Sequence, residues 1–349
     1  MSLFISRTPY RVSFFGGGTD YPKWYLRHGG AVLSAAINKY CYLMGRFYPP
    51  YFPNTRHRIV WSHIENVSSI SEILHPAVRV GLQAYGFDDS RGVELHHQGD
   101  LPARTGIGSS SSFAVGLIKL LKAMKNEEIT RHELALAAID LEQNHLNDTV
   151  GSQDQMAAAY GGLNVIRFNA DGSIAVEPVA ISEDRRSSLE SRLMMFFTGT
   201  SRMSSEQANA IVEGIEAKSD TLGAMLGLVF HARDVLERGQ LDDFGRLLDE
   251  TWRRKRALAA NVSNSAIDEI YDAACAAGAL GGKLLGAGGA GFMLFYVPEA
   301  RQAAVRNALR HLIHVSVKVD PGGSILLYQS ENGNQPALSA APEKILQAC

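Results

Sequence analysis

Cysteine is scarce in this chain of 349 residues, which contains only Cys41, Cys275 and Cys349. Three scattered cysteines are too few for a disulfide framework, and their spacing does not match that of a zinc site. Small secreted proteins depend on disulfides far more than proteins of reducing compartments do. We therefore expect a cytoplasmic protein.

The chain also lacks an excess of charge of either sign. Its 34 Lys and Arg residues nearly balance 36 Asp and Glu residues, for a net charge of −2. The densest basic cluster, 253–256, is short, and we interpret it as the solvated face of a helix. Because nucleic-acid binding needs a basic patch or stripe, no nucleic-acid partner is expected.

Long apolar runs are missing as well. No segment reaches the roughly 18 apolar residues of a membrane-spanning helix. The N-terminal stretch MSLFISRTPYR contains Arg7 and Arg11 where a signal peptide has an unbroken apolar core. We expect neither a leader peptide nor a membrane partner.

Apolar material is nevertheless abundant, at 46% of the residues. Since one core rarely grows beyond roughly 250 to 300 residues, two domains are expected. The polar segment 181–192 marks the boundary between an N-terminal domain, 1–180, and a C-terminal domain, 190–330. The remainder, 331–349, is rich in Asn, Gly, Pro and Ala and is predicted to be a loose tail.

Strand and helix patterns are mixed without regular β-α-β alternation, which favours an α+β fold. Helices are predicted at 68–86, 113–125, 134–145 and 154–160, through most of 204–278, and at 300–312. Extended segments are predicted at 3–15, 31–49, 92–102, 163–168, 174–179, 193–200, 292–298 and 324–330. Two capping boxes are predicted, at 130–133 and at 152–155.

The stretch TGIGSSSSFAVG at 105–116 lies directly before an apolar helix. A linker is a poor interpretation, because the core helix follows without a break. Either the serines cap the helix, or the loop binds an anion. A helix N-terminus offers free backbone N–H groups and a partial positive charge, which suit a phosphate.

A second glycine stretch, GGKLLGAGGAGF, contains Gly286, Gly288 and Gly291, which match the letters of a dinucleotide fingerprint. That fingerprint needs a strand before it and a helix after it, whereas here an apolar strand follows. We therefore reject a dinucleotide site. The stretch is either a turn that packs against a flat or charged partner, or a tight hairpin.

Three acids stand out beside these motifs. Asp20 lies in GGGTDY and could bind sugar hydroxyls or simply hydrogen-bond its own turn. Glu142 is on a helix with an otherwise apolar face, near His145. Asp154 is near the start of the next helix, where the helix dipole alone favours an acid.

Taken in chain order, the three glycine stretches and Asp154 resemble the GHMP kinases, the superfamily of galactokinase, homoserine kinase and mevalonate kinase. The matching segments are 7–21, 102–112, 151–155 and 283–291. The resemblance implies an N-terminal domain like the second domain of ribosomal protein S5. It also implies a ferredoxin-like C-terminal domain and an active site between the two.

The resemblance also implies ATP and Mg²⁺ as cofactors and assigns the site residues. ATP phosphates would bind at Arg104, Gly106, Ile107, Gly108, Ser109, Ser110 and Ser111. Mg²⁺ would bind Ser110 and Glu142. Asp154 would be the catalytic acid–base residue, with Arg11 as its partner. We expect the acceptor near Gly17, Gly18, Asp20 and Gly288, and a phosphate group of the acceptor at Arg202 and Lys255.

Within the superfamily the motifs are most similar to the kinases that phosphorylate the anomeric C1 hydroxyl of D-glycero-D-manno-heptose 7-phosphate, a step toward GDP-heptose and surface or capsule polysaccharides. L-Fucose kinases share much of the pattern. Galactokinases have Glu-His where this chain has Gly17 and Gly18, which disfavours galactose. A sugar sensor without activity is a further alternative, although such proteins often lose residues that are present here. A homodimer is compatible with the sequence.

Overall fold

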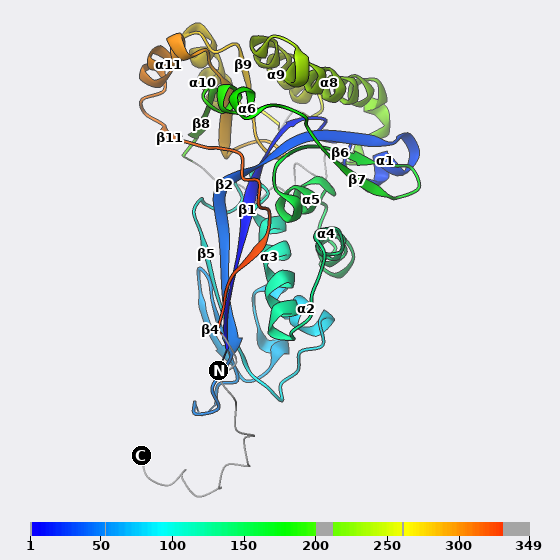
Figure 1. Ribbon diagram of the computed structural model, residues 1–349, viewed down its shortest axis with the longest axis vertical. Helices are drawn as coiled ribbons and strands as arrows, with labels where there is room; N and C mark the ends of the chain where they lie inside the picture. The colour runs from blue at the N-terminus through cyan, green and yellow to red at the C-terminus, as the bar shows by residue number, and fades with distance from the viewer. Residues whose placement is uncertain (1, 53, 200–211, 260–261, 331–349) are drawn as a thin grey trace, which may run out of the picture.

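The computed structural model describes residues 2–52, 54–199, 212–259 and 262–330. Two sheets organise the molecule, a tall one that runs down the lower part of Figure 1 and a small one at its upper end. Within the described residues, no helix is both long and apolar enough to cross a membrane. The mixed sheets and helices confirm the α+β expectation.

In the described residues the large sheet has eight strands, built around two long neighbours, β1 (Leu3–Phe15) and β2 (Gly30–Phe47). Its main path runs β12-β1-β2-β5-β3-β4, and β6 and β7 extend from the other end of β2. The bounds of the remaining strands are β3 His57–Val60, β4 Ile64–Val67, β5 Val93–Gly99, β6 Leu163–Phe168, β7 Ile174–Pro178 and β12 Ile325–Gln329.

Helix α3 (Ser109–Met124) packs on β1 and β2 and is the central helix of this sheet. Its apolar positions Leu117, Leu120 and Leu121 are fully buried. A Cβ at Gly45 of β2 would lie 2.8 Å from Leu120 Cδ2, so this position must stay small for the helix to approach. The packing therefore fixes where the N-terminus of α3 stands.

Four further helices accompany this sheet. Helices α4 and α5 pack on each other and on α3, and α2 packs on the far end of α3. Their bounds are α1 Pro22–His28, α2 Pro76–Ala84, α4 Arg131–Asp140 and α5 Gln153–Tyr160. The capping box predicted at Thr130 and Glu133 is confirmed.

The small sheet is antiparallel in the order β11-β8-β10-β9, with β8 Leu193–Phe197, β9 Gly281–Leu284, β10 Phe292–Tyr296 and β11 Ile313–Val315. Helix α9 packs on β9 and β10, and α8 bridges to the large sheet by contacting β1 and β2. The helices of this part are α6 Glu183–Glu190, α8 Ser219–Arg238, α9 Leu241–Arg256, α10 Ser265–Ala276 and α11 Gln302–Ala308.

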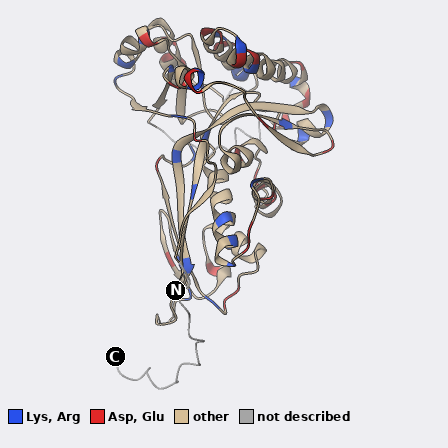
Figure 2. Ribbon diagram, viewed as in Figure 1, with Lys and Arg blue, Asp and Glu red and all other residues tan. Residues whose placement is uncertain are grey.

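The cluster at 253–256 ends helix α9. Arg253 and Arg254 each pair with an acid one turn earlier, Asp249 at 2.8 Å and Glu250 at 2.7 Å. Figure 2 shows this helix carrying charges of both signs. A solvated helix face is thus correct for these two arginines, but Lys255 is buried.

The last strand does not stay with the small sheet. β12 pairs antiparallel with β1, at the edge of the large sheet, so the chain returns to the part where it began. The division into 1–180 and 190–330 remains a prediction, and the pairing of β12 shows that a strand of the second range lies in the large sheet. The local sequence pattern predicted strand β12, but it could not show that this strand pairs with β1.

Candidate active site

A pocket opens where the two sheets meet, and residues of both parts line it. The large-sheet part supplies the N-terminus of α3, the first turn of α5, β1 and the loop after β1. The upper part supplies Met225, Lys255, Leu258, Lys283, Gly286 and Ala287. This placement agrees with an active site between the two expected domains.

The loop before α3 forms one wall of the pocket. Gly106 and Gly108 have φ of 81° and 72°, a conformation that favours glycine. No side chain caps α3. Ser109 Oγ instead accepts a hydrogen bond from the Arg104 backbone N–H (3.1 Å). The first N–H groups of the helix thus lack a side-chain cap, which favours the anion-binding interpretation over the capping one.

The four serines of this loop have different environments. Ser112 is fully buried, and its hydroxyl donates to the Pro9 carbonyl oxygen (2.9 Å) in the core. Ser111 is buried beside the pocket, whereas Ser110 is exposed. Of the residues expected to bind ATP, Ile107 alone does not line the pocket: its side chain is buried, and its carbonyl accepts from Arg11 N.

The second glycine stretch packs directly against this loop. A Cβ at Gly286 would lie 2.3 Å from Gly106 Cα, and one at Gly291 would lie 2.2 Å from the Thr105 carbonyl oxygen. The interpretation as a turn packed on a flat partner is thus correct, and the partner is the backbone of the loop. Gly288 does not line the pocket, and a Cβ added there would lie 2.7 Å from Val262 Cα.

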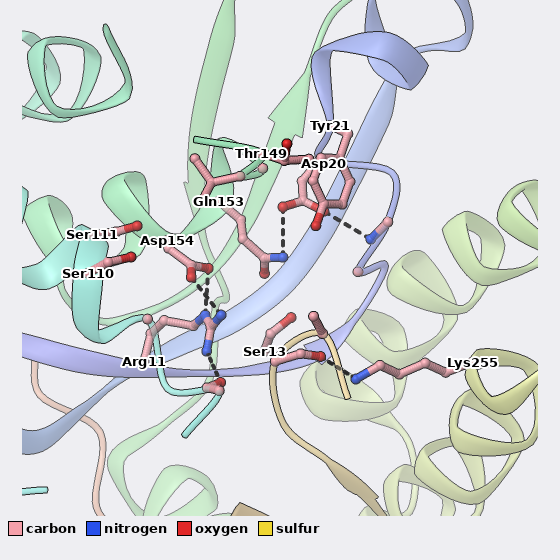
Figure 3. Close-up of a pocket in the computed structure, with 18 of the residues that line it drawn as sticks. Arg11, Ser13, Asp20, Tyr21, Ser110, Ser111, Thr149, Gln153, Asp154 and Lys255 are labelled. Atoms are coloured by element: carbon pink, nitrogen blue, oxygen red, sulfur yellow. Dashed lines mark hydrogen bonds and ion pairs between the residues drawn. The ribbon is translucent and has the colours of Figure 1, made fainter. Parts of the chain in front are cut away.

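Arg11 and Asp154 form a forked ion pair in the pocket (Figure 3). Arg11 Nε and Nη2 donate to the two carboxylate oxygens, each at 2.7 Å, and Nη1 donates to the Gly106 carbonyl oxygen at 2.6 Å. The Arg11 side chain is 5% exposed and that of Asp154 is 20% exposed. One guanidinium therefore ties the acid to the loop and leaves the acid accessible.

The Arg11–Asp154 pair lies so close to Gly108 that it leaves little room for a side chain there. A Cβ at Gly108 would lie 3.2 Å from both Arg11 Cγ and Asp154 Oδ2. Asp154 lies in the first turn of α5, but its side chain pairs with Arg11, so capping is not its main contact.

Glu142 lies behind Ser110 and Ser111, on a π-helical turn, Leu141–His145, that ends helix α4. A plain helix was expected there, and such turns occur often at functional sites. Burial raises the pKa of Glu142 to about 7. Side-chain interactions with Ser111, Gln155 and Ser110 act in the opposite direction and lower this pKa. Its Oε2 accepts from Gln155 Nε2 at 2.6 Å, while Oε1 has no hydrogen-bond partner among the described residues.

Asp20 is buried in the wall of the pocket. Its Oδ1 accepts from Gly18 N (2.9 Å), as expected of a turn aspartate, and its Oδ2 accepts from Gln153 Nε2 (2.8 Å). Burial and the nearby Asp154 charge raise the pKa of Asp20, whereas these two hydrogen bonds lower it. Gly17 and Gly18 also line the pocket.

Two buried lysines face the pocket from its upper side. Lys255 Nζ donates to the carbonyl oxygens of Leu284 (2.9 Å) and Gly286, and Lys283 Nζ donates to that of Phe14 (2.8 Å). Neither lysine has an acidic partner within the described ranges. Burial, and then the charge of Arg11, lower the pKa of Lys255 to about 7. Arg202 lies outside the described residues.

The sequence did not single out several lining residues, namely Ser13, Thr149, Gln153 and Lys283. Gln153 and Gln155 flank Asp154, but the pattern from Ser152 to Gln155 was interpreted as a capping box. That interpretation is wrong: no side chain caps α5, and the two glutamines hydrogen-bond the acids Asp20 and Glu142 instead.

Two family models match the chain, the GHMP kinase N-terminal domain over residues 72–162 and the GHMP kinase C-terminal domain over residues 232–314. Both lie where the fold places the walls of the pocket. The chain belongs to the GHMP kinases, and it is a phosphotransferase with an alcohol group as acceptor.

Three characterised relatives are similar along most of the chain. A D-glycero-alpha-D-manno-heptose 7-phosphate kinase of Campylobacter jejuni is 29% identical and covers 89% of this chain and 94% of its own. A bifunctional fucokinase/GDP-fucose pyrophosphorylase of Arabidopsis thaliana is 28% identical, but the match spans only 31% of that protein. A galactokinase of Pyrococcus furiosus is 25% identical over 88% of this chain and 93% of its own.

Solved structures support the fold. A heptose 1-phosphate kinase structure from Bacteroides thetaiotaomicron has a TM-score of 0.74 at 23% identity and covers 92% of this chain and 97% of its own. A Lactococcus lactis galactokinase structure with galactose has a TM-score of 0.71 at 18% identity, over 93% and 95%.

Proposed function

We propose that the protein transfers the γ-phosphoryl group of ATP to the anomeric C1 hydroxyl of D-glycero-D-manno-heptose 7-phosphate, giving the 1,7-bisphosphate. This product would feed GDP-heptose and surface polysaccharide synthesis. The forked pair of Arg11 and Asp154, next to the Gly106–Ser111 loop, carries the assignment of the chemistry. The Campylobacter relative supports the choice of acceptor.

ATP phosphates would bind at the N-terminus of α3, where backbone N–H groups and the helix dipole favour negative charge. Arg104, with φ of 62°, lines the same pocket and offers a guanidinium to these phosphates. Gly106 and Gly108 allow the backbone to approach the phosphates closely.

Mg²⁺ fits the acid behind this loop. Glu142 has one buried carboxylate oxygen without a hydrogen-bond partner among the described residues, and its carboxyl interacts with Ser110. A cation would supply the missing partner. Mg²⁺ is commonly held by one or two carboxylates plus substrate phosphates rather than by a full set of protein ligands. When bound, Mg²⁺ would offset the phosphate charge.

In the transfer step, the acceptor hydroxyl oxygen forms a bond to the γ-phosphorus while the bond from that phosphorus to the β-phosphate oxygen breaks. The hydroxyl proton passes to Asp154, and ADP leaves. Arg11 holds the carboxylate in position through two N–H donors and stabilises its negative charge. An anomeric hydroxyl is more acidic than an ordinary alcohol, so a weak base suffices.

The acceptor's own phosphate would bind the cationic side of the pocket. Lys255, together with Arg202, is our proposal for this contact, and Lys283 adds a second buried amine nearby. Without an anion these lysines lack an acidic partner among the described residues, and burial of an unpaired charge is unfavourable.

The test is an ADP-release assay with heptose 7-phosphate, L-fucose, galactose and mevalonate as acceptors. The proposal predicts the highest kcat/KM for heptose 7-phosphate, and a preference for any other acceptor would overturn it.

Asp154→Ala should reduce kcat at least about a hundredfold, because a general base contributes a rate factor of roughly 10² to 10⁴. Asp171→Ala, in an exposed turn, is the matched control.

A further inference from the structure

Two buried oxygen atoms beside the pocket have no hydrogen-bond partner in the described part of the chain, Gln153 Oε1 and Ser13 Oγ. Both residues line the pocket, and they are 8% and 6% exposed. Buried polar atoms in folded proteins are nearly always paired, so each unpaired atom calls for a reason. A bound hydroxyl group would supply the missing partner.

Asp20 holds the Gln153 amide in one orientation. Its Oδ2 accepts from Gln153 Nε2 at 2.8 Å and its Oδ1 accepts from Gly18 N, so both carboxyl oxygens are acceptors in this arrangement. The amide NH₂ faces Asp20, which leaves Oε1 directed elsewhere. Figure 3 shows the nitrogen pointing at Asp20 and the oxygen pointing away from it.

Asp20 is in turn fixed by its own contacts. Gly18 N donates to its other oxygen, and Ser152 N donates to its backbone carbonyl oxygen, both at 2.9 Å. A Cβ at Gly151 would lie only 1.9 Å from Asp20 Oδ2, so the chain closes tightly around this carboxyl. Asp20 thus serves as a positioning residue for Gln153, in addition to lining the pocket.

Gln153 directly precedes Asp154, and both side chains reach the same pocket. We infer that Gln153 Oε1 accepts a hydrogen bond from the acceptor hydroxyl on the carbon next to the phosphorylated one. Gln153 is then a specificity-determining residue that demands a vicinal hydroxyl. Resting on the proposed function, the inference assigns this contact to the C2 hydroxyl of an acceptor phosphorylated at C1.

The test compares each sugar with its 2-deoxy counterpart: heptose 7-phosphate, L-fucose and galactose, in the wild type and in Gln153→Met. The methionine side chain has a similar length, but its sulfur is a much weaker hydrogen-bond acceptor than an amide oxygen. The wild type should prefer the hydroxylated sugar about five- to tenfold in kcat/KM, since a hydrogen bond of ordinary strength gives a ratio of this size. In Gln153→Met the ratio should fall toward one.

Gln143→Met is the matched control, because Gln143 does not itself line the pocket; its Nε2 donates to the carbonyl oxygen of Val150 and to Ser152 Oγ. It should keep the wild-type ratio. Asp20→Asn offers a second route: an Asn amide can also donate to Gln153 Oε1, so the fixed orientation is lost and the ratio should fall. Thermal melting checks that each variant is folded.

An undiminished ratio in folded Gln153→Met would overturn the inference, whichever sugar is the substrate. Activity on fucose or galactose instead of heptose 7-phosphate would refute the proposed substrate, yet the ratio would still test Gln153. A wild type inactive on all three sugars would overturn both.

Discussion

Ser110 and Ser112 are two residues apart and have different partners. Ser110 is exposed at the pocket beside Glu142, whereas the Ser112 hydroxyl bonds Pro9 O in the core. We predict that Ser110→Ala lowers kcat/KM at least tenfold with little change in melting temperature. Ser112→Ala should cost about 1 kcal/mol of stability and leave kcat nearly unchanged. Equal loss of activity in the two variants would contradict these roles.

Lys255 should make acceptor binding depend on pH. Burial and the charge of Arg11 lower its pKa to about 7, so at pH 8 the amine is mostly neutral in the empty pocket. Arg11 and Lys283 are the charged groups that face it from β1 and β9. A bound phosphate favours the ammonium form and raises this pKa, so binding at pH 8 takes up a proton.

Calorimetry of heptose 7-phosphate binding in two buffers of different ionisation enthalpy measures this uptake. The uptake should be present at pH 8, should decline toward pH 6 where Lys255 is already protonated, and should decrease in Lys255→Met. The same uptake in Lys255→Met would contradict an anion contact at this residue.

At the scale of elements, the glycine turn between β9 and β10 packs directly against the loop before α3, the proposed binding site of the ATP phosphates. Gly286→Ala would place a Cβ 2.3 Å from Gly106 Cα, at φ of 70°. Because both partners are backbone, the loop must move, and we predict a KM for ATP raised at least tenfold. Gly223→Ala, in α8 with nothing within 4 Å of the new Cβ, should keep the KM and stabilise by about 0.5–1 kcal/mol. An unchanged KM in Gly286→Ala would contradict the contact.

Local patterns predicted most of these elements and the main motifs. The long strands β1 and β2, the helix after the serines and the β9–β10 glycine turn all follow from periodicity and glycine placement. The short hairpin β3–β4 was missed, because four-residue strands leave little alternation to detect. Gln153 and Gln155 were also missed, since their partners Asp20 and Glu142 lie 133 and 13 residues away and only folding brings them together.

On the scale of the whole molecule, the return of β12 to β1 pairs the first and last strands of the described residues. Leu3 N also donates to Ser330 Oγ at 2.7 Å, beside the paired strands. We predict that removing 331–349 preserves activity and melting temperature. Removing 325–349 exposes the edge of β1 and should lower the melting temperature by several degrees. Equal melting temperatures of the two truncated chains would contradict a structural role for β12.

The pocket draws its walls from both parts of the molecule, so the Gly106–Ser111 loop, Asp154 and the buried lysines come together only when both parts are present. ³¹P NMR of the reaction with ATP most directly tests the proposed phosphorylation of heptose 7-phosphate at C1. We expect ADP and a second sugar phosphate signal, coupled to the anomeric proton, while the 7-phosphate signal persists. No new anomeric signal from heptose 7-phosphate, despite folded protein with Mg²⁺ and ATP, would contradict it.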